Sequence, residues 1–176
     1  SPEERIYTWW NDESRIHKLK IVENSLTGKE KYGAEFYISD LLGCTIYKVN
    51  SEREIEVLAS GLQFPSSLAV DADGNIFYTT TPLGGRSGYN LLTYKAAICM
   101  LNPETGDSKL VYSFDETVSD YGTTGGWAEI EYKNLKYQMP IGYNITNVLY
   151  ETEDRLDFLM TNSIRGTLKG VSIFKE

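Results

Sequence analysis

Short stretches in which apolar and polar residues alternate recur along the chain, separated by glycine, proline, asparagine and aspartate. A strand turns successive side chains to opposite faces, whereas an amphipathic helix needs apolar residues at i, i+3, i+4 and i+7. No window sustains the helical spacing, so the expected fold class is all-β. The pattern predicts strands at residues 5–10, 15–22, 35–40, 45–50, 55–59, 67–70, 76–80, 97–101, 109–114, 147–150, 156–161 and 171–174.

The clearest hairpin joins residues 67–70 to residues 76–80 through Asp73-Gly74, because glycine supplies the positive φ that tight hairpin turns need. The stretch from Leu62 to Phe77 reads Leu-x-x-Pro-x-x-Leu-Ala-Val-Asp-x-x-Gly-Asn-Ile-Phe. It resembles the inner hairpin of a β-propeller blade of the NHL and gluconolactonase/regucalcin type. Asn-Pro-Glu-Thr-Gly at residues 102–106 resembles the turn between the third and fourth strands of such a blade.

The resemblance implies one propeller-like domain over residues 1–176, built from four-stranded blades. The order of strands recurs in units at about 15–59, 66–114 and 145–175, with a less regular segment at 115–140. The last unit lacks a fourth strand, and the strand at 5–10 is expected to close it. Three blades are fewer than the roughly four to eight of a propeller, so we expect another chain or fragment to complete the ring. A small closed β-barrel is the alternative fold.

Composition and charge exclude some partners. The formal net charge is −8, which disfavours the basic surface that nucleic acids require. No run reaches the length of a membrane-spanning helix, so we expect neither a nucleic-acid partner nor membrane insertion. Asn144-Ile145-Thr146 is a glycosylation sequon, and an extracellular, secreted location is the expectation.

Few residues suit nucleophilic or zinc chemistry. His17 is the only histidine, which leaves little for a catalytic triad or a histidine-based zinc site. Cys44 and Cys99 lack metal spacing and are interpreted as small buried side chains, with a disulfide between them as the alternative. Five carboxylates lie in predicted turns and are interpreted as solvated: Asp71, Asp73, Glu151, Glu153 and Asp154.

The resemblance to gluconolactonase-type enzymes also implies a divalent cation held by glutamate, asparagine and aspartate at the channel. In those proteins Pro-Asn-Gly opens the inner strand and its asparagine is a ligand, whereas this chain has Pro65-Ser66-Ser67. Hydroxyls are weaker calcium ligands than amide or carboxylate oxygens. Calcium is therefore expected only if Asp40, Asn144 and Asn147 contribute.

Loops between strands place candidate ligand-binding residues at one end of the predicted blades. The chain is rich in aromatic residues, at 12%, and a subset in irregular regions is expected to line a pocket for an aromatic or hydrophobic ligand. Phe-Tyr-rich second strands also resemble those of insect ommochrome-binding carriers. The candidate ligand-binding residues are Phe64, Ser66, Thr81, Tyr89, Tyr94, Tyr143, Asn144, Asn162 and Arg165.

Three functions follow from these observations. The first is a non-catalytic propeller module that carries a small ligand or docks a protein partner. The second is a metal-dependent lactonase or esterase of the gluconolactonase type, which needs carboxylates and amides that converge on a cation. The third is a structural subunit of a larger oligomer, as an incomplete ring would require.

Overall fold

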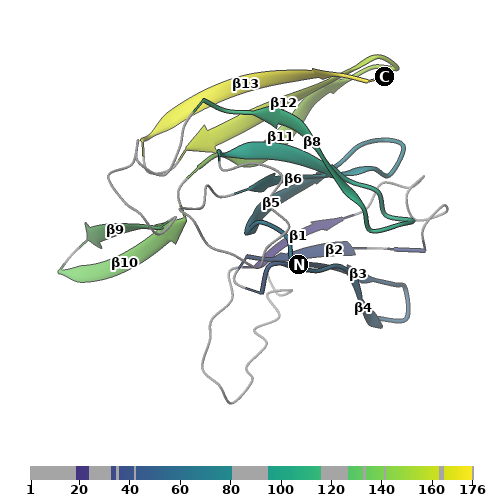
Figure 1. Ribbon diagram of the computed structural model, residues 1–176, viewed down its shortest axis with the longest axis horizontal. Helices are drawn as coiled ribbons and strands as arrows, with labels where there is room; N and C mark the ends of the chain where they lie inside the picture. Colours follow the sequence, from purple (N-terminus) through teal and green to yellow (C-terminus); the bar gives the residue numbers. More distant parts are fainter. Residues whose placement is uncertain are drawn as a thin grey trace.

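A computed structural model of the protein describes residues 19–23, 33–34, 36–41, 43–80, 95–115, 127–132, 134–140, 142–162 and 165–175. All regular elements in this part of the chain are β-strands, and all of them pair antiparallel (Figure 1). The prediction of an all-β fold with blade-like sheets is confirmed. The described residues include no helix of the length and apolarity that a membrane crossing requires.

Three sheets dominate the fold, and in each of them the strands follow one another in chain order. The first sheet contains β1 (Leu19–Glu23), β2 (Phe36–Asp40), β3 (Thr45–Val49) and β4 (Ile55–Ala59). The second contains β5 (Pro65–Val70), β6 (Ile76–Thr80), β7 (Ala97–Leu101) and β8 (Ser108–Ser113). The third contains β11 (Asn144–Glu151), β12 (Arg155–Asn162) and β13 (Thr167–Phe174).

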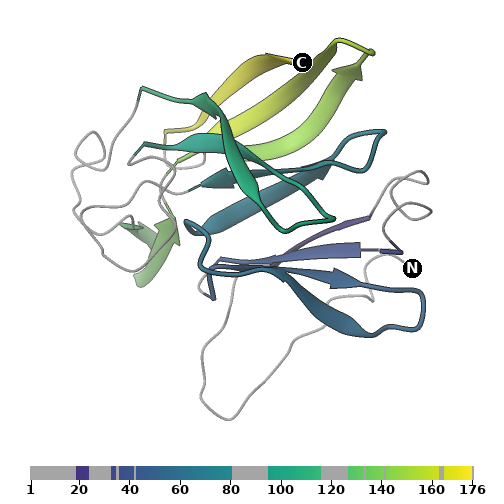
Figure 2. The same cartoon turned by 45° about the vertical axis from the view of Figure 1, so that its right-hand side comes forward.

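The sheets are stacked face to face, with the second sheet between the first and the third (Figure 2). Strand β5 contacts β1 and β2 of the first sheet, and β11 contacts β5 and β6 of the second. Apolar side chains fill both gaps, because burial of apolar surface drives sheets to pack in layers.

The second sheet is buried on both faces. Leu68, Ile76 and Tyr78 face the first sheet, whereas Phe77 and Ile98 face the third. Every residue of β6 is buried as a result. This double burial explains why β7 has a continuous apolar sequence, whereas β12 alternates between buried and half-buried residues.

The structure corrects some predicted boundaries. Residues 127–140, expected to be irregular, form a hairpin of β9 (Trp127–Tyr132) and β10 (Leu135–Pro140). The strand predicted at 171–174 is longer than expected, since β13 already begins at Thr167. The strand predicted at 5–10 lies outside the described residues.

The alternative of a small closed barrel is wrong for the part of the chain that the structure describes. Its strands form four separate sheets, none of which closes on itself. A closed barrel would need its first and last strands to pair.

No disulfide joins Cys44 and Cys99, and both are buried, as expected of small core side chains. Cys44 precedes β3, and Cys99 lies in β7 beside Tyr78. Burial raises the pKa of the Cys99 thiol to about 12, although a hydrogen bond with Tyr78 partly opposes this shift. The thiol is therefore neutral at physiological pH and a weak nucleophile.

Candidate functional site

The second and third sheets present two ends at which polar side chains gather. We call one the loop end: it contains the starts of β5 and β11 and the ends of β6 and β12. We call the other the turn end: it contains the turns that follow β5 and β11. The expected ligand-binding residues that the structure describes belong to the loop end or to the segment that precedes β5.

Hydroxyl groups join the two sheets at the loop end. Ser67 Oγ accepts a hydrogen bond of 2.8 Å from the backbone N–H of Ile145 in β11. Thr79 Oγ1 in β6 lies 2.5 Å from Ser67 Oγ and 2.8 Å from Ser66 Oγ. Ser66, a predicted ligand residue, thus bonds within the protein, and Ser67 makes the link to the third sheet that sequence reasoning missed.

An aromatic pair lies at the same end. The ring of Tyr143, just before β11, stacks on Phe114, just after β8, with centroids 4.3 Å apart and planes inclined by 16°. Lys169 of β13 places its Nζ 5.1 Å from the centre of the Phe114 ring and 5.6 Å from that of Tyr143. An ammonium group over aromatic faces is attracted by their quadrupoles. The pair forms a stacked platform that Lys169 covers, since Phe114 is only 1% exposed and Tyr143 6% exposed.

Amide and guanidinium groups lie at the same end of the third sheet. Asn162 is buried at the end of β12, and its Oδ1 accepts a hydrogen bond of 3.1 Å from the backbone N–H of Arg165. Asn144 is half-buried and pairs with Thr161 across β11 and β12. Arg165 is exposed in the turn that leads to β13. The structure therefore brings Tyr143, Asn144, Asn162 and Arg165 together.

Other predicted ligand residues lie elsewhere. Phe64 precedes β5 with a φ of +39° and is buried among its neighbours. Thr81, Tyr89 and Tyr94 lie outside the described residues.

The residues expected to hold calcium do not form a ligand set in the described part of the chain. Asp40 ends β2 in the first sheet, and its Oδ1 accepts a hydrogen bond of 2.8 Å from Gly43 N–H in the following turn. Asn144 lies in the third sheet, and the side chain of Asn147 is not described. Ser66 is bonded to Thr79. We derive no chemical step through a cation at this end.

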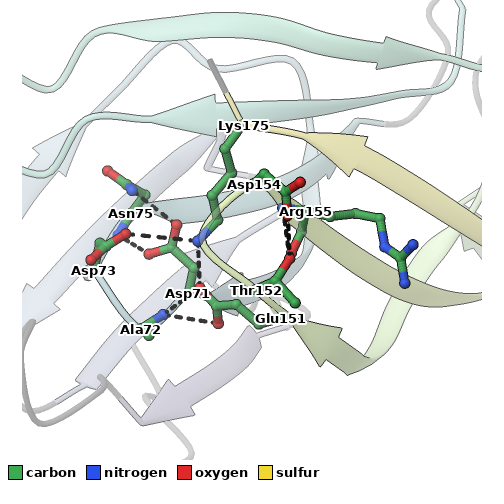
Figure 3. A network of polar contacts seen from close by, with 9 residues as sticks. All are labelled: Asp71, Ala72, Asp73, Asn75, Glu151, Thr152, Asp154, Arg155 and Lys175. Carbon is green, nitrogen blue, oxygen red and sulfur yellow. Dashed lines mark hydrogen bonds and ion pairs between the residues drawn. The ribbon is translucent and has the colours of Figure 1, made fainter.

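Three carboxylates approach one another at the turn end instead (Figure 3). Oxygens of Asp71, Asp73 and Glu151 lie within 4.8 Å of one another. Lys175, directly after β13, places its Nζ 2.7 Å from Glu151 and 3.7 Å from Asp73. The Lys175 ammonium group thus neutralises part of the carboxylate charge that a metal cation would need.

This network ties two sheets together. Both carboxylate oxygens of Glu151 accept the backbone N–H of Ala72 at 3.1 Å, and Asp71 Oδ1 accepts the backbone N–H of Asn75 at 2.8 Å. The interpretation of Asp71 as solvated is wrong, since it is only 2% exposed. Asp71 is buried because Glu151 in the neighbouring turn and Lys175 after β13 cover it (Figure 3).

The pKa values of this network shift in ways that its geometry explains. Burial raises the pKa of Asp71 above its usual value, because the hydrogen bonds from Asn75 only partly compensate for lost hydration. Burial acts to lower the pKa of Lys175. The hydrogen bond and charge of Glu151, with the charges of Asp71 and Asp73, outweigh that effect and raise it.

The raised pKa of Lys175 predicts an alkaline loss of stability. A lysine whose pKa is higher in the folded state stabilises the fold below its unfolded pKa, here 10.5, and this contribution disappears as pH rises through the folded pKa. Lys175→Met should therefore lower Tm at neutral pH, and its difference from wild type should shrink above pH 10.5. Thermal melts across this range, read by circular dichroism, test the prediction.

The control is Lys109→Met, an exposed lysine in β8. Tyr78 and Cys99 also have raised pKa values, so every variant is expected to lose stability in alkali. Only the difference between variant and wild type reports on Lys175. A Lys175→Met curve parallel to wild type at all pH values would contradict the prediction.

Comparisons with known proteins give only a weak likeness. No family model matches the sequence, and no curated protein matches it. Among solved structures, a gluconolactonase from Xanthomonas campestris is similar at 13% identity and a TM-score of 0.27. The match covers 88% of this chain and 76% of that one. A likeness this distant carries no argument about activity.

Proposed function

We propose that the protein is a non-catalytic binding module that holds a small aromatic ligand at the loop end of the second and third sheets. The observation that supports this is the stacked pair of Tyr143 and Phe114 with Lys169 over both rings. Binding sites commonly combine aromatic surface with a few convergent polar groups. Here Asn144, Asn162 and Arg165 supply those groups, and they come from β11, β12 and the turn after β12.

The charges at this end favour an anionic ligand. Arg165 and Lys169 are exposed cations on one side of the platform, in a chain whose net charge is −8. Because Tyr143 is only 6% exposed, an aromatic ring that carries a carboxylate would have to displace the Lys169 side chain before it stacked on Tyr143, and its carboxylate would then pair with Lys169 or Arg165. Lys169, now over the rings, would then contact the carboxylate at their edge.

The lactonase alternative receives less support from the loop end. Such an enzyme needs several hard oxygen ligands that converge on a cation. The hydroxyls of Ser66 and Ser67 are bonded to Thr79, and the three carboxylates that do converge lie at the turn end around Lys175. We therefore favour binding over catalysis.

A calorimetric titration with two matched probes tests the proposal. The probes are 1-naphthoate and the uncharged 1-naphthalenemethanol, which present the same ring with and without a carboxylate. Wild type should bind both, and naphthoate more tightly. Lys169→Gln should weaken naphthoate binding about fivefold, as the loss of one cation contact implies, and leave naphthalenemethanol unchanged.

Lys109→Gln removes an equally exposed lysine from β8 and should change neither affinity. Tyr143→Ala should weaken both probes, because each stacks on the same ring. If wild type binds neither probe at millimolar concentration, or if Lys169→Gln binds naphthoate as wild type does, the proposal is wrong.

A further inference from the structure

The outward face of the first sheet is apolar. Its cross-strand pairs form two rows: Phe36, Val49 and Ile55 in one, and Ile38, Tyr47 and Val57 in the other. All six are half-buried or exposed, and Val57 is 61% exposed. On the opposite face of the same strands Tyr37 and Ile46 are fully buried against the second sheet.

The outward face of the third sheet carries exposed apolar residues among polar ones. Leu168 and Phe174 of β13 are 70% and 71% exposed, and Tyr150 of β11 is 53% exposed. The residues that alternate with them in β13, Val171 and Ile173, are buried against the second sheet. Large apolar side chains are thus exposed at both ends of the stack.

A charged pair lies within the outward face of the third sheet. The Arg155 guanidinium lies 5.2 Å from the centre of the Tyr150 ring and 3.0 Å from the Asp157 carboxylate. Tyrosine and arginine are the residue types that interfaces between proteins concentrate. Large exposed apolar side chains beside such anchors are typical of an interaction site.

The two internal gaps obey one packing rule. The first strand of each sheet contacts the first and second strands of the preceding sheet: β5 contacts β1 and β2, and β11 contacts β5 and β6. If the rule continues beyond the third sheet, the next strand to contact β11 and β12 is the first strand of another sheet. In this chain, β1 is such a first strand, and it belongs to a sheet whose outward face is apolar.

We propose that a second copy of this chain docks its first sheet on the outward face of the third sheet, in a head-to-tail arrangement. The interface continues the packing between sheets that already exists twice within each copy. The two contacting faces differ, and each copy carries both of them: the outward face of its first sheet and the outward face of its third sheet. Head-to-tail contacts of this kind close into a ring or extend into a filament. This proposal concerns the outward faces, and it goes beyond ligand binding at the loop end.

Sedimentation velocity of the full chain with two charge variants tests this interface. Val57→Glu places a charge on the first-sheet face, and Leu168→Glu places one on the third-sheet face. Wild type should form species heavier than 19.9 kDa as concentration rises, and each variant alone should sediment as a monomer. An equal mixture of the two variants should form a dimer and nothing larger, since only one intact pair of faces remains.

The equal mixture of the two variants is the experiment that distinguishes head-to-tail docking from other contacts. A contact between two first sheets would survive Leu168→Glu, and a contact between two third sheets would survive Val57→Glu. Either result overturns the proposal, as does a wild type that stays monomeric because other residues of its own chain cover the faces. A mixture that stays monomeric while wild type assembles also overturns it.

Two controls test whether the variants are correctly folded. Both substituted residues are exposed, so circular dichroism and Tm should match wild type. If either variant misfolds, Ile55→Lys and Phe174→Lys replace the pair on the same two faces. Leu110→Glu, on an exposed leucine of β8 in the middle sheet, should assemble as wild type does.

Discussion

Replacing Phe158 with alanine should lower the free energy of unfolding by about 3–5 kcal/mol, the range for phenylalanine removed from a packed core. Phe158 is fully buried in β12, and its ring centroid lies 5.3 Å from that of Phe77 in β6. The side chain fills the gap between the second and third sheets, and alanine would leave a cavity there. Urea denaturation read by tryptophan fluorescence and by circular dichroism measures the change.

Phe174→Ala is the matched control, because it removes the same side chain from an exposed position in the same sheet. In dilute monomeric protein it should change the free energy of unfolding by less than about 1 kcal/mol. If both variants lose the same small amount, the third sheet does not pack on the second as described.

The second large effect is expected at Gly106, in the turn between β7 and β8. Its φ is +76°, and a Cβ added there would lie 2.7 Å from the backbone carbonyl oxygen of Leu58 in β4. Gly106→Ala should cost about 2–4 kcal/mol, which combines the strain of a left-handed residue with that of overpacking. The turn of the second sheet would have to move away from the edge of the first.

Gly166→Ala separates the two contributions. Gly166 has a φ of +64°, but an added Cβ meets no atom within 4 Å. This variant should lose only about 1–2 kcal/mol, the conformational part. The excess loss in Gly106→Ala then measures the contact with Leu58. Equal losses in urea denaturation would show that the two segments do not touch in solution.

Much of the fold could be predicted because local signals agree with the tertiary structure. Asp73-Gly74 and the β-branched residues around it predicted the hairpin of β5 and β6, and Gly74 indeed has a φ of +85°. The hairpin of β9 and β10 was missed because its turn contains no glycine. Asn134 takes the left-handed conformation there, with a φ of +62°. Asparagine tolerates this conformation, but it is a weaker signal than glycine.

The contacts of the candidate site could be predicted only in outline. The recurring order of strands implies that the turns at Asp71 and Glu151 lie at the same end of their sheets, and in the structure the two carboxylates approach each other there. The hydrogen bond from Ala72 to Glu151 joins residues 79 positions apart, and the one from Ile145 to Ser67 joins residues 78 apart. Such pairs depend on how two sheets are placed, and local pattern carries no information about that placement.

The order of strands has a consequence for biosynthesis. Each sheet contains consecutive strands, so the first sheet can form as soon as Ala59 has left the ribosome. At that moment both of its faces are apolar, and the second sheet that will cover one of them has not yet been made. Nascent chains with such exposed surface are prone to aggregate. The face that β5 and its sheet will cover therefore stays exposed until residues 65–113 have emerged and folded.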